Sequence, residues 1–537
     1  MISQKRFLPY VIVFLTVFIG LIWRPFFIGF YGDDVPLAIA DTFEEALFYG
    51  RRERFLYFFP IAIPRYFFGH DQISWGWYAI TVAGLTAAAL FSFFKAVLSK
   101  LSGTTKNATF AAGASAILYI FLPWSIAPVL WNTALSQLAM VGLLALAGTA
   151  LFSRFSALKK AFVFVTLLVL SSLIYETIWG AWIPLILIKL SLDTSTERQE
   201  TYKVFAAAVV AQIGLIANYL PSYGMEGRVL SGGGLKLSAK LSLFAENVFI
   251  RFPFEVLSSM GVIGLMAAPL FMFVLFKLYQ RRSEFLKGPS MLLVILACVA
   301  GIMGGILVVT LGNYRITGTT DEARFLSAIS IWLCLMFGML SSLVLSLRAK
   351  NIQIVTTAVY VLIIAAFFLR ASDWGRGHSY QRDVIASVPV EAIAKLIEPL
   401  ENQGATINFD IEQTVLLVEL GAPMHLFHGL DNSRGLQFVS QKIESETGKS
   451  VVGLFVNNRL WKTTVQGTEL SRARCANPEE LVGGKAVNAP QFIFWSYKTG
   501  EVRKISQSFQ QGCTRTIQRY EFLGELLYPF MGNPRRQ

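Results

Sequence analysis

The sequence predicts a polytopic α-helical membrane protein that carries a polar, mixed α/β domain at its C-terminal end. Of its 537 residues, 54% are hydrophobic and only 15% are charged, whereas soluble domains are about 25% charged. Apolar runs of about 20 residues, the length that crosses the hydrocarbon core of a bilayer, recur as far as residue 370 and then cease. We therefore predict a transmembrane module over residues 1–370 and a soluble domain over residues 371–537.

About eleven apolar runs are predicted to be transmembrane helices. They lie near residues 8–28, 73–98, 108–124, 129–152, 161–176, 178–192, 203–220, 257–277, 290–311, 325–347 and 352–370. Glu176 interrupts the apolar stretch 161–192, which makes the two runs within it the least regular. The first run is followed by residues 23–25 (WRP) instead of small residues, so we predict a retained helix and not a cleaved signal peptide.

Lysine and arginine residues in alternate loops set the predicted orientation. They cluster before the first run and near residues 100–106, 154–160, 198–203, 277–287 and 348–350. The positive-inside rule makes these loops cytoplasmic, which places the N-terminus in the cytoplasm and the C-terminal domain outside an inner or plasma membrane. The formal net charge of +13 is explained by these loops, so nucleic-acid binding is not expected.

Residues 371–537 are predicted to fold as an extracytoplasmic α/β domain. Val388–Leu400 has the apolar period of an amphipathic helix. Thr414–Val418, Ser450–Val456 and Gln491–Tyr497 have the composition of strands and are separated by Gly, Asn and Pro.

The four cysteines fall into two classes. Cys298 and Cys334 lie inside apolar runs and are expected to be inert core residues. Cys475 and Cys513 lie in the polar domain, and in an oxidising compartment they are expected to form a disulfide that stabilises the domain by roughly 3–4 kcal/mol.

The first outer loop, residues 24–72, holds the strongest candidates for chemistry. Asp34 precedes Val35-Pro36 and an amphipathic run, so it is suited to cap a helix as well as to act in catalysis. Asp33 has no such structural explanation, and a carboxylate at a dry interface can accept the proton of a hydroxyl nucleophile. We predict Asp33, with Asp34 as the alternative, as a catalytic base.

The rest of this loop offers candidates for substrate binding. Glu44 and Glu45 lie in a predicted interfacial helix, where they either form a solvated acidic face or contact substrate hydroxyls or a metal. Arg51 and Arg52 are candidates for binding a lipid phosphate, because arginine binds phosphate in a bidentate manner. The aromatic run Phe55–His70 is interrupted by two prolines and is predicted to lie in the membrane interface.

Three charged residues in later segments are further candidates. Glu176 is an ionisable residue between apolar runs, which predicts a cavity or a substrate contact unless it sits at the outer interface. Arg315 and Arg324 flank a short outer loop, where they are either phosphate ligands or interfacial anchors. The sequence offers no nucleotide-binding glycine motif and no Ser-His-Asp arrangement, and His425 and His428 lack the partners of a zinc site.

The combined pattern resembles the GT-C superfamily of integral-membrane glycosyltransferases. The resemblance rests on a cytoplasmic N-terminus, an outer first loop that opens with Gly32-Asp33-Asp34, and interfacial helices in that loop. It continues with Glu176, with Arg324-Phe325 at the end of a late outer loop, and with the extracytoplasmic C-terminal domain. The layout of residues 1–370 is similar to that of the protein O-mannosyltransferase, aminoarabinose transferase and arabinofuranosyltransferase groups.

This resemblance implies a polyprenyl-phosphate sugar as donor and a glycan, lipid or protein as acceptor, with membrane lipids as surroundings. Asp33 or Asp34 would activate the acceptor hydroxyl, Arg324 would bind the donor phosphate, and transfer would invert the sugar's configuration. The two acids are adjacent and do not have Asp-x-Asp spacing, so the resemblance leaves a divalent metal open and implies no other cofactor.

Two other functions remain open at this stage. A polysaccharide polymerase or ligase with a lipid-diphosphate donor would depend on arginines more than on an aspartate. A transporter or flippase would have internal repeats and paired charges at the membrane midplane, whereas the charges here gather at the predicted outer face.

Overall fold

The structure is a computed structural model of the whole chain. It describes residues 4–27, 44, 55–69, 71–102, 105–122, 125, 128–129, 134–174, 178, 180–226, 237–253, 276, 289–311, 326–346, 354–355, 357–358, 361–365, 386–398, 414–419, 437–455, 461–466, 469–474, 491–497 and 499–510. The chain divides into two compact units, which we describe separately. The helical unit comprises Met1–Phe26 and Ala40–Asp373, and the sheet unit comprises Phe27–Ile39 and Trp374–Gln537.

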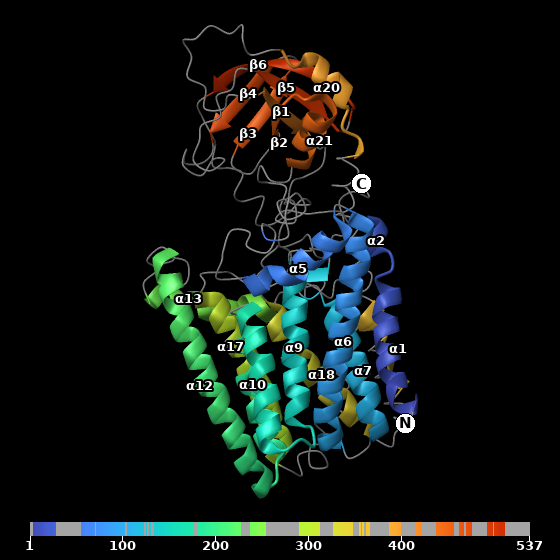
Figure 1. Cartoon of the computed structure of the whole chain (residues 1–537), viewed down its shortest axis with the longest axis vertical. Coiled ribbons are helices and arrows are strands. Elements are labelled where there is room, and N and C mark those ends of the chain that lie inside the picture. The colour runs from blue at the N-terminus through green and yellow to red at the C-terminus, as the bar shows by residue number, and fades with distance from the viewer. Residues whose placement is uncertain are drawn as a thin grey trace. The chain divides into compact units, whose positions relative to one another are not determined.

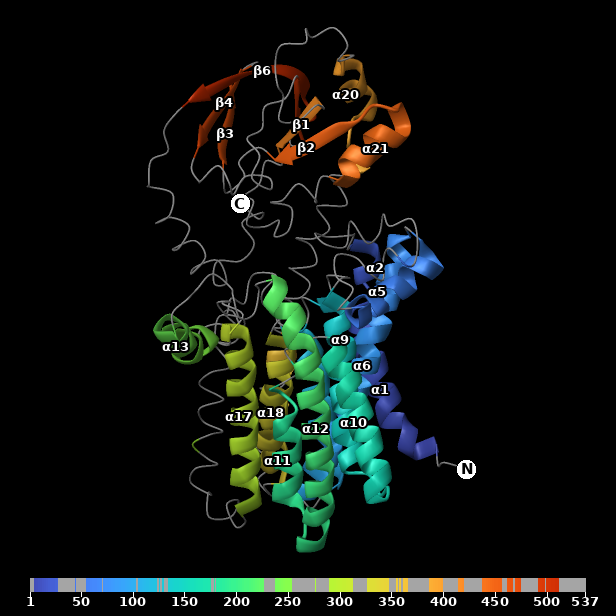
Figure 2. The same cartoon turned by 60° about the vertical axis from the view of Figure 1, so that its left-hand side comes forward.

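The described part of the helical unit is built from helices that run mostly along one axis (Figures 1 and 2). These are α1 (Gln4–Gly20), α2 (Arg24–Phe27), α5 (Phe55–Phe68), α6 (Gln72–Ser102), α7 (Thr105–Phe121), α9 (Leu135–Leu151), α10 (Ala157–Ile174), α11 (Ile183–Leu192), α12 (Ser195–Glu226), α13 (Leu237–Glu246), the π-helix η5 (Asn247–Arg251), α17 (Pro289–Leu311) and α18 (Ser327–Ser346).

Six of the described helices are long and apolar enough to cross a membrane. Their candidate spans are Phe7–Phe26, Gln72–Leu101, Ala157–Ile174, Ser195–Ala217, Met291–Thr310 and Ser327–Leu345. The chain is therefore an integral membrane protein, as predicted. The larger count of eleven spans and the orientation of the termini stay predictions.

Glycines of α17 make room for side chains of α18. A Cβ atom added at Gly301 would come within 2.6 Å of the Trp332 ring, and one added at Gly305 would collide with Ile329. The spacing Gly-x-x-x-Gly is common where helices pack closely in membranes, because small residues let the helices approach. The contact between α17 and α18 is therefore tight at these two positions.

Single polar side chains join other helix pairs. Thr86 of α6 donates to the carbonyl oxygen of Leu138 in α9 at 3.1 Å, and Ser171 of α10 donates to the Met140 oxygen of α9 at 3.0 Å. Tyr119 near the end of α7 donates to the Ser327 oxygen at the start of α18 at 3.1 Å. Such buried bonds satisfy side chains that have no access to water.

Helix α5 runs across the ends of other helices instead of alongside them (Figure 1), and it contacts α6, α9 and α10. We call this end of the helical unit the α5 end. Pro60, Ile61 and Pro64 of α5 are buried, whereas Tyr66 and Phe67 have exposed fractions of 69% and 70%. A transverse helix with exposed aromatic side chains suits a membrane–water boundary, and the interfacial location of Phe55–His70 stays a prediction.

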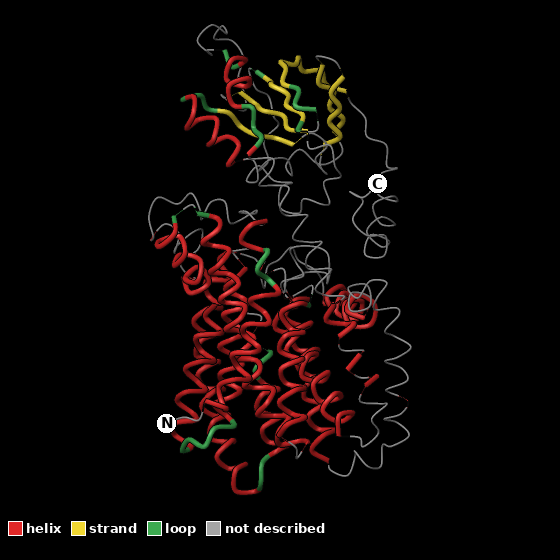
Figure 3. Tube along the Cα trace, turned by 90° about the vertical axis from the view of Figure 1, so that its right-hand side faces the viewer, coloured by secondary structure: helices red, strands yellow, loops and turns green. Residues whose placement is uncertain are grey.

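The strands that the structure describes all belong to the sheet unit (Figure 3). They are β1 (Thr414–Glu419), β2 (Val451–Phe455), β3 (Trp461–Gln466), β4 (Glu469–Arg474), β5 (Phe492–Ser496) and β6 (Val502–Gln510), with helices α20 (Val390–Leu396) and α21 (Gln437–Thr447). The strand order is β2-β1-β5-β6-β4-β3. β1 pairs in parallel with β2 and β5, β6 is antiparallel to β5 and parallel to β4, and β3 is antiparallel to β4.

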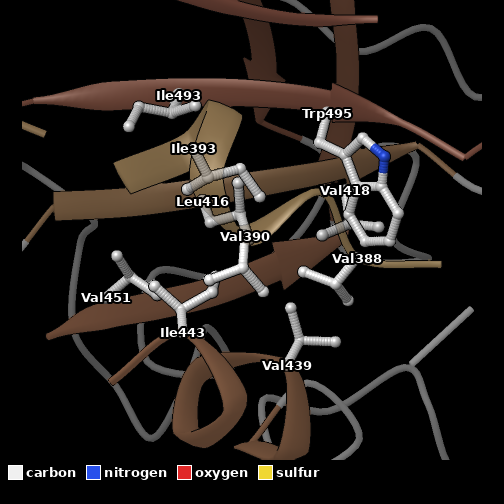
Figure 4. Close-up of a cluster of buried hydrophobic side chains, with 10 residues drawn as sticks. All are labelled: Val388, Val390, Ile393, Leu416, Val418, Val439, Ile443, Val451, Ile493 and Trp495. Carbon is white, nitrogen blue, oxygen red and sulfur yellow. The ribbon is translucent and has the colours of Figure 1, made fainter. Parts of the chain in front are cut away.

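The core of the sheet unit lies between the strands β1, β2 and β5 and the helices α20 and α21 (Figure 4). Leu416 and Val418 of β1 and Ile493 and Trp495 of β5 alternate toward it, as the period of two of a strand requires. Strands β1, β2 and β5 overlap the three predicted strands, and α20 lies inside the predicted amphipathic helix. The position of this unit outside a membrane remains a prediction.

Candidate functional site

Most of the predicted site residues lie outside the residues that the structure describes. These are Asp33, Asp34, Glu45, Arg51, Arg52, Glu176, Arg315 and Arg324, together with the cysteines Cys475 and Cys513. Glu44 is described: it is helical and exposed. Its exposure is compatible with a solvated acidic face and also with a substrate contact, so the assignments stay predictions.

At the α5 end, the structure describes a framework of buried polar residues. Arg24, at the start of α2, is fully buried, and its Nε donates to the carbonyl oxygen of Val129 at 2.9 Å. This bond joins residues that are 105 positions apart in the chain. A buried guanidinium is retained only where hydrogen bonds or charges compensate it, so the end of the first span is fixed against the 128–129 segment.

The link between α5 and α6 is set by a glycine and a capping aspartate. Gly69 has φ +56° and lies just past the C-terminal end of α5, a position where glycine is favoured; its carbonyl oxygen accepts a bond from Trp75 Nε1 at 3.0 Å. Asp71 caps α6, because Oδ1 accepts from the Ile73 amide at 3.1 Å and Oδ2 from Ser74 Oγ at 2.5 Å. The bond from Ser74 is the main cause that lowers the pKa of Asp71.

The π-helix η5 contributes a second polar contact at the α5 end. Asn247 is fully buried, and its Nδ2 donates to Thr310 Oγ1 in the last turn of α17 at 3.0 Å. Glu246 and Arg251 form an ion pair at 2.6 Å that is partly exposed. π-Helical turns are rare and often mark functional sites, and the bond to Thr310 fixes this one against α17.

Gln137 in the first turn of α9 is the most unusual residue of this end. Its exposed fraction is 1%, and neither amide atom, Nε2 or Oε1, has a hydrogen-bond partner among the residues that the structure describes. Sequence patterns do not single it out, because one glutamine at the start of an apolar run is common.

A buried ion pair lies between α11 and α12, and sequence reasoning missed it. Lys189 and Asp193 have exposed fractions of 5% and 7% and are bonded to each other. Thr201 Oγ1 also donates to Asp193 at 2.6 Å, and the Lys189 ammonium lies 5.6 Å from the centre of the Phe152 ring. Because every charge in this cluster has a partner, we assign it a structural role.

Among the residues that the structure describes, no group of three His, Cys, Asp or Glu side chains is placed to hold a metal ion. The divalent metal that the resemblance left open therefore stays unassigned. Cys298 and Cys334 are buried and unpaired, as expected for inert core residues.

Comparison with known proteins gives a distant structural likeness. No family model and no curated protein matches the chain. Two solved structures of ArnT from Cupriavidus metallidurans resemble it, each at 11% sequence identity. The structure bound to undecaprenyl phosphate has a TM-score of 0.43 and covers 84% of this chain and 90% of its own. The apo structure has a TM-score of 0.41 and covers 83% and 89%.

Both likenesses are weak, at 11% sequence identity and TM-scores below 0.5, so membership of the GT-C superfamily stays a prediction from the sequence. The low TM-scores do not carry residue roles or an activity from ArnT to this chain.

Proposed function

We propose that the chain is a membrane glycosyltransferase that moves a sugar from a polyprenyl-phosphate donor to an acceptor hydroxyl on the extracytoplasmic face. The observation that carries the proposal is the pairing of a membrane-spanning helical unit with a first long loop that contains Asp33 and Asp34 and continues into the transverse aromatic helix α5. An amphiphilic donor needs both an apolar region for its lipid and polar groups at the boundary for its sugar phosphate.

The proposed chemistry is a single displacement. The Asp33 carboxylate accepts the proton of the acceptor hydroxyl as its oxygen attacks the anomeric carbon. The bond between that carbon and the phosphate oxygen breaks, and polyprenyl phosphate leaves with the bonding electrons. The product sugar then has the opposite anomeric configuration to the donor.

The remaining candidates take supporting roles in this proposal. Asp34 caps the following helix or replaces Asp33 as base. The carboxylates contact hydroxyl groups of the sugar; they are Glu44, Glu45 and Glu176. The arginines bind the donor phosphate; they are Arg51, Arg52, Arg315 and Arg324.

A transfer assay in lipid vesicles tests the function. Purified protein is supplied with synthetic polyprenyl-phosphate hexose or pentose and with acceptor fractions from the host envelope. We expect release of polyprenyl phosphate and a glycosylated product of inverted configuration by NMR. Retention of configuration would exclude single displacement. Transfer from lipid diphosphates alone would favour the polymerase or ligase, and movement of a solute without bond cleavage would favour a transporter.

Arg324→Ala is expected to weaken binding of polyprenyl phosphate about 10- to 100-fold, since a hydrogen bond to a charged group contributes about 1.5–3 kcal/mol. Protection of the protein against thermal unfolding by added polyprenyl phosphate measures this affinity. Arg198→Ala is the matched control, because Arg198 is exposed in the first turn of α12 on the predicted cytoplasmic side. An equal affinity in Arg324→Ala and Arg198→Ala would rule out the phosphate role.

A further inference from the structure

We propose that Gln137 binds hydroxyl groups of a sugar ring at the α5 end of the helical unit and thereby helps to determine which sugar is accepted. The inference rests on the proposed function and adds to it a residue outside the loops that carry the predicted site. The ring belongs either to the donor or to a sugar acceptor, and the experiment below separates the two.

The first argument is the burial of an amide without partners. Gln137 is 1% exposed, and neither Nε2 nor Oε1 makes a hydrogen bond in the structure. Leaving one buried polar group unsatisfied costs about 1–3 kcal/mol, and native proteins contain few such groups. Two such atoms on one side chain, at the start of one helix, leave a donor and an acceptor for a molecule that binds there.

Helix capping does not explain the residue. Gln137 is the third residue of α9. From this position a glutamine side chain can accept a hydrogen bond from the backbone N–H of the N-cap residue, which precedes the helix. The N-cap of α9 is Ala134, and it has no side-chain cap. Because Oε1 accepts no hydrogen bond, the capping function that usually selects glutamine at this position is not in use.

The helical period places Gln137 on the interior face of α9. The half-exposed or exposed residues of α9 are Ala139, Leu143, Leu146 and Thr149. At about 100° per residue, Gln137 lies on the opposite face, shared with Leu144 and Gly148, seven and eleven residues further on. A Cβ atom at Gly148 would meet Phe93 of α6 at 2.6 Å and Leu185 of α11 at 3.1 Å. This face therefore turns toward α6 and α11, and Gln137 is its first polar residue at the α5 end.

The chemistry of the amide selects the ligand class. Nε2 only donates and Oε1 only accepts. A phosphate would satisfy Nε2 and leave Oε1 facing another acceptor, whereas hydroxyl groups both donate and accept. Two neighbouring hydroxyls of a sugar ring satisfy both amide atoms together. The neighbouring residues Leu138 and Val141 of α9 are fully buried, and a hydrogen bond away from water is stronger than one in water.

A matched pair of variants tests the inference. Gln137→Met keeps the length of the side chain and removes both polar atoms, so the ligand-free protein should unfold at the same or a higher temperature. Its kcat/KM for transfer should fall about 10- to 100-fold because two substrate hydroxyls lose their partners. Ser115→Ala is the control: Ser115 is a buried hydroxyl without a partner in the middle of α7, and its loss should leave transfer unchanged.

Three readouts decide the outcome. A rise in KM for the donor alone, with weaker discrimination against a deoxy-sugar donor, assigns the donor ring; a rise for the acceptor alone assigns the acceptor ring. Unchanged kcat/KM in Gln137→Met, or a fall that only follows lost thermal stability, overturns the inference while the proposed function stands. Absence of transfer by the wild type from every polyprenyl-phosphate donor overturns the proposed function, and the inference with it.

Discussion

Asp33→Asn is expected to lower the rate of sugar transfer by about 10²- to 10⁴-fold, the usual contribution of a positioned general base. The substitution keeps the shape of the side chain and removes its ability to accept a proton from the acceptor hydroxyl. The rate is measured as polyprenyl phosphate released from a labelled donor in vesicles.

Two further variants separate catalysis from structure. Asp34→Asn should have a smaller effect on the rate, because asparagine is also a good N-cap residue. Asp71→Asn is the control for removal of an exposed carboxylate near the first loop, since Asp71 caps α6 and asparagine keeps that acceptor. If Asp33→Asn and Asp34→Asn both retain the wild-type rate, the chain does not use a first-loop aspartate as base.

Lys189→Met is expected to destabilise the folded protein by about 3–5 kcal/mol, because it leaves the Asp193 carboxylate buried and without its counter-charge. Asp193→Leu should have an effect of similar size for the reciprocal reason. The double variant should recover most of the lost stability, since apolar side chains of similar volume replace buried ion pairs at little cost. Denaturant unfolding in mixed micelles measures the three free energies.

Lys160→Met serves as the control for this pair. Lys160 bonds Glu200 at 3.3 Å, and the Glu200 side chain is 46% exposed. Partly exposed pairs contribute only about 0–1 kcal/mol, so this variant should unfold close to the wild type. A loss in Lys189→Met no larger than the loss in Lys160→Met would show that the buried pair is not a structural element.

The sequence predicts the elements of the fold more fully than their contacts. The strand pattern from Thr414 and the amphipathic period from Val388 both lead to elements found in the structure. Two prolines predicted that the run of residues 55–70 is broken, yet α5 is a continuous helix with Pro60 and Pro64 inside it. Proline in a helix interior costs about 3 kcal/mol, and burial of both rings against the other helices offsets part of this cost.

Sequence patterns likewise predict some residues of the candidate site and miss others. The rule that marked Glu176, an ionisable residue among apolar ones, applies equally to Lys189 and would have found it. The hydrogen bond from Arg24 to Val129 joins segments that are far apart in the chain. Whether the buried amide of Gln137 finds a partner likewise depends on which distant segments pack around it. Residue periodicity records which face of a helix is buried, and it does not record which polar atoms meet there.

The packing of α17 against α18 also bears on the route that the proposed lipid donor would take. At Gly301 and Gly305 the space that a Cβ atom would need is filled by the side chains of Trp332 and Ile329, so the two helices touch at these positions. If the chain acts on a polyprenyl-phosphate donor, as we propose, the lipid tail would reach the site without passing between the helices at these two glycines. The glycines of α17 would then influence substrate entry as well as packing.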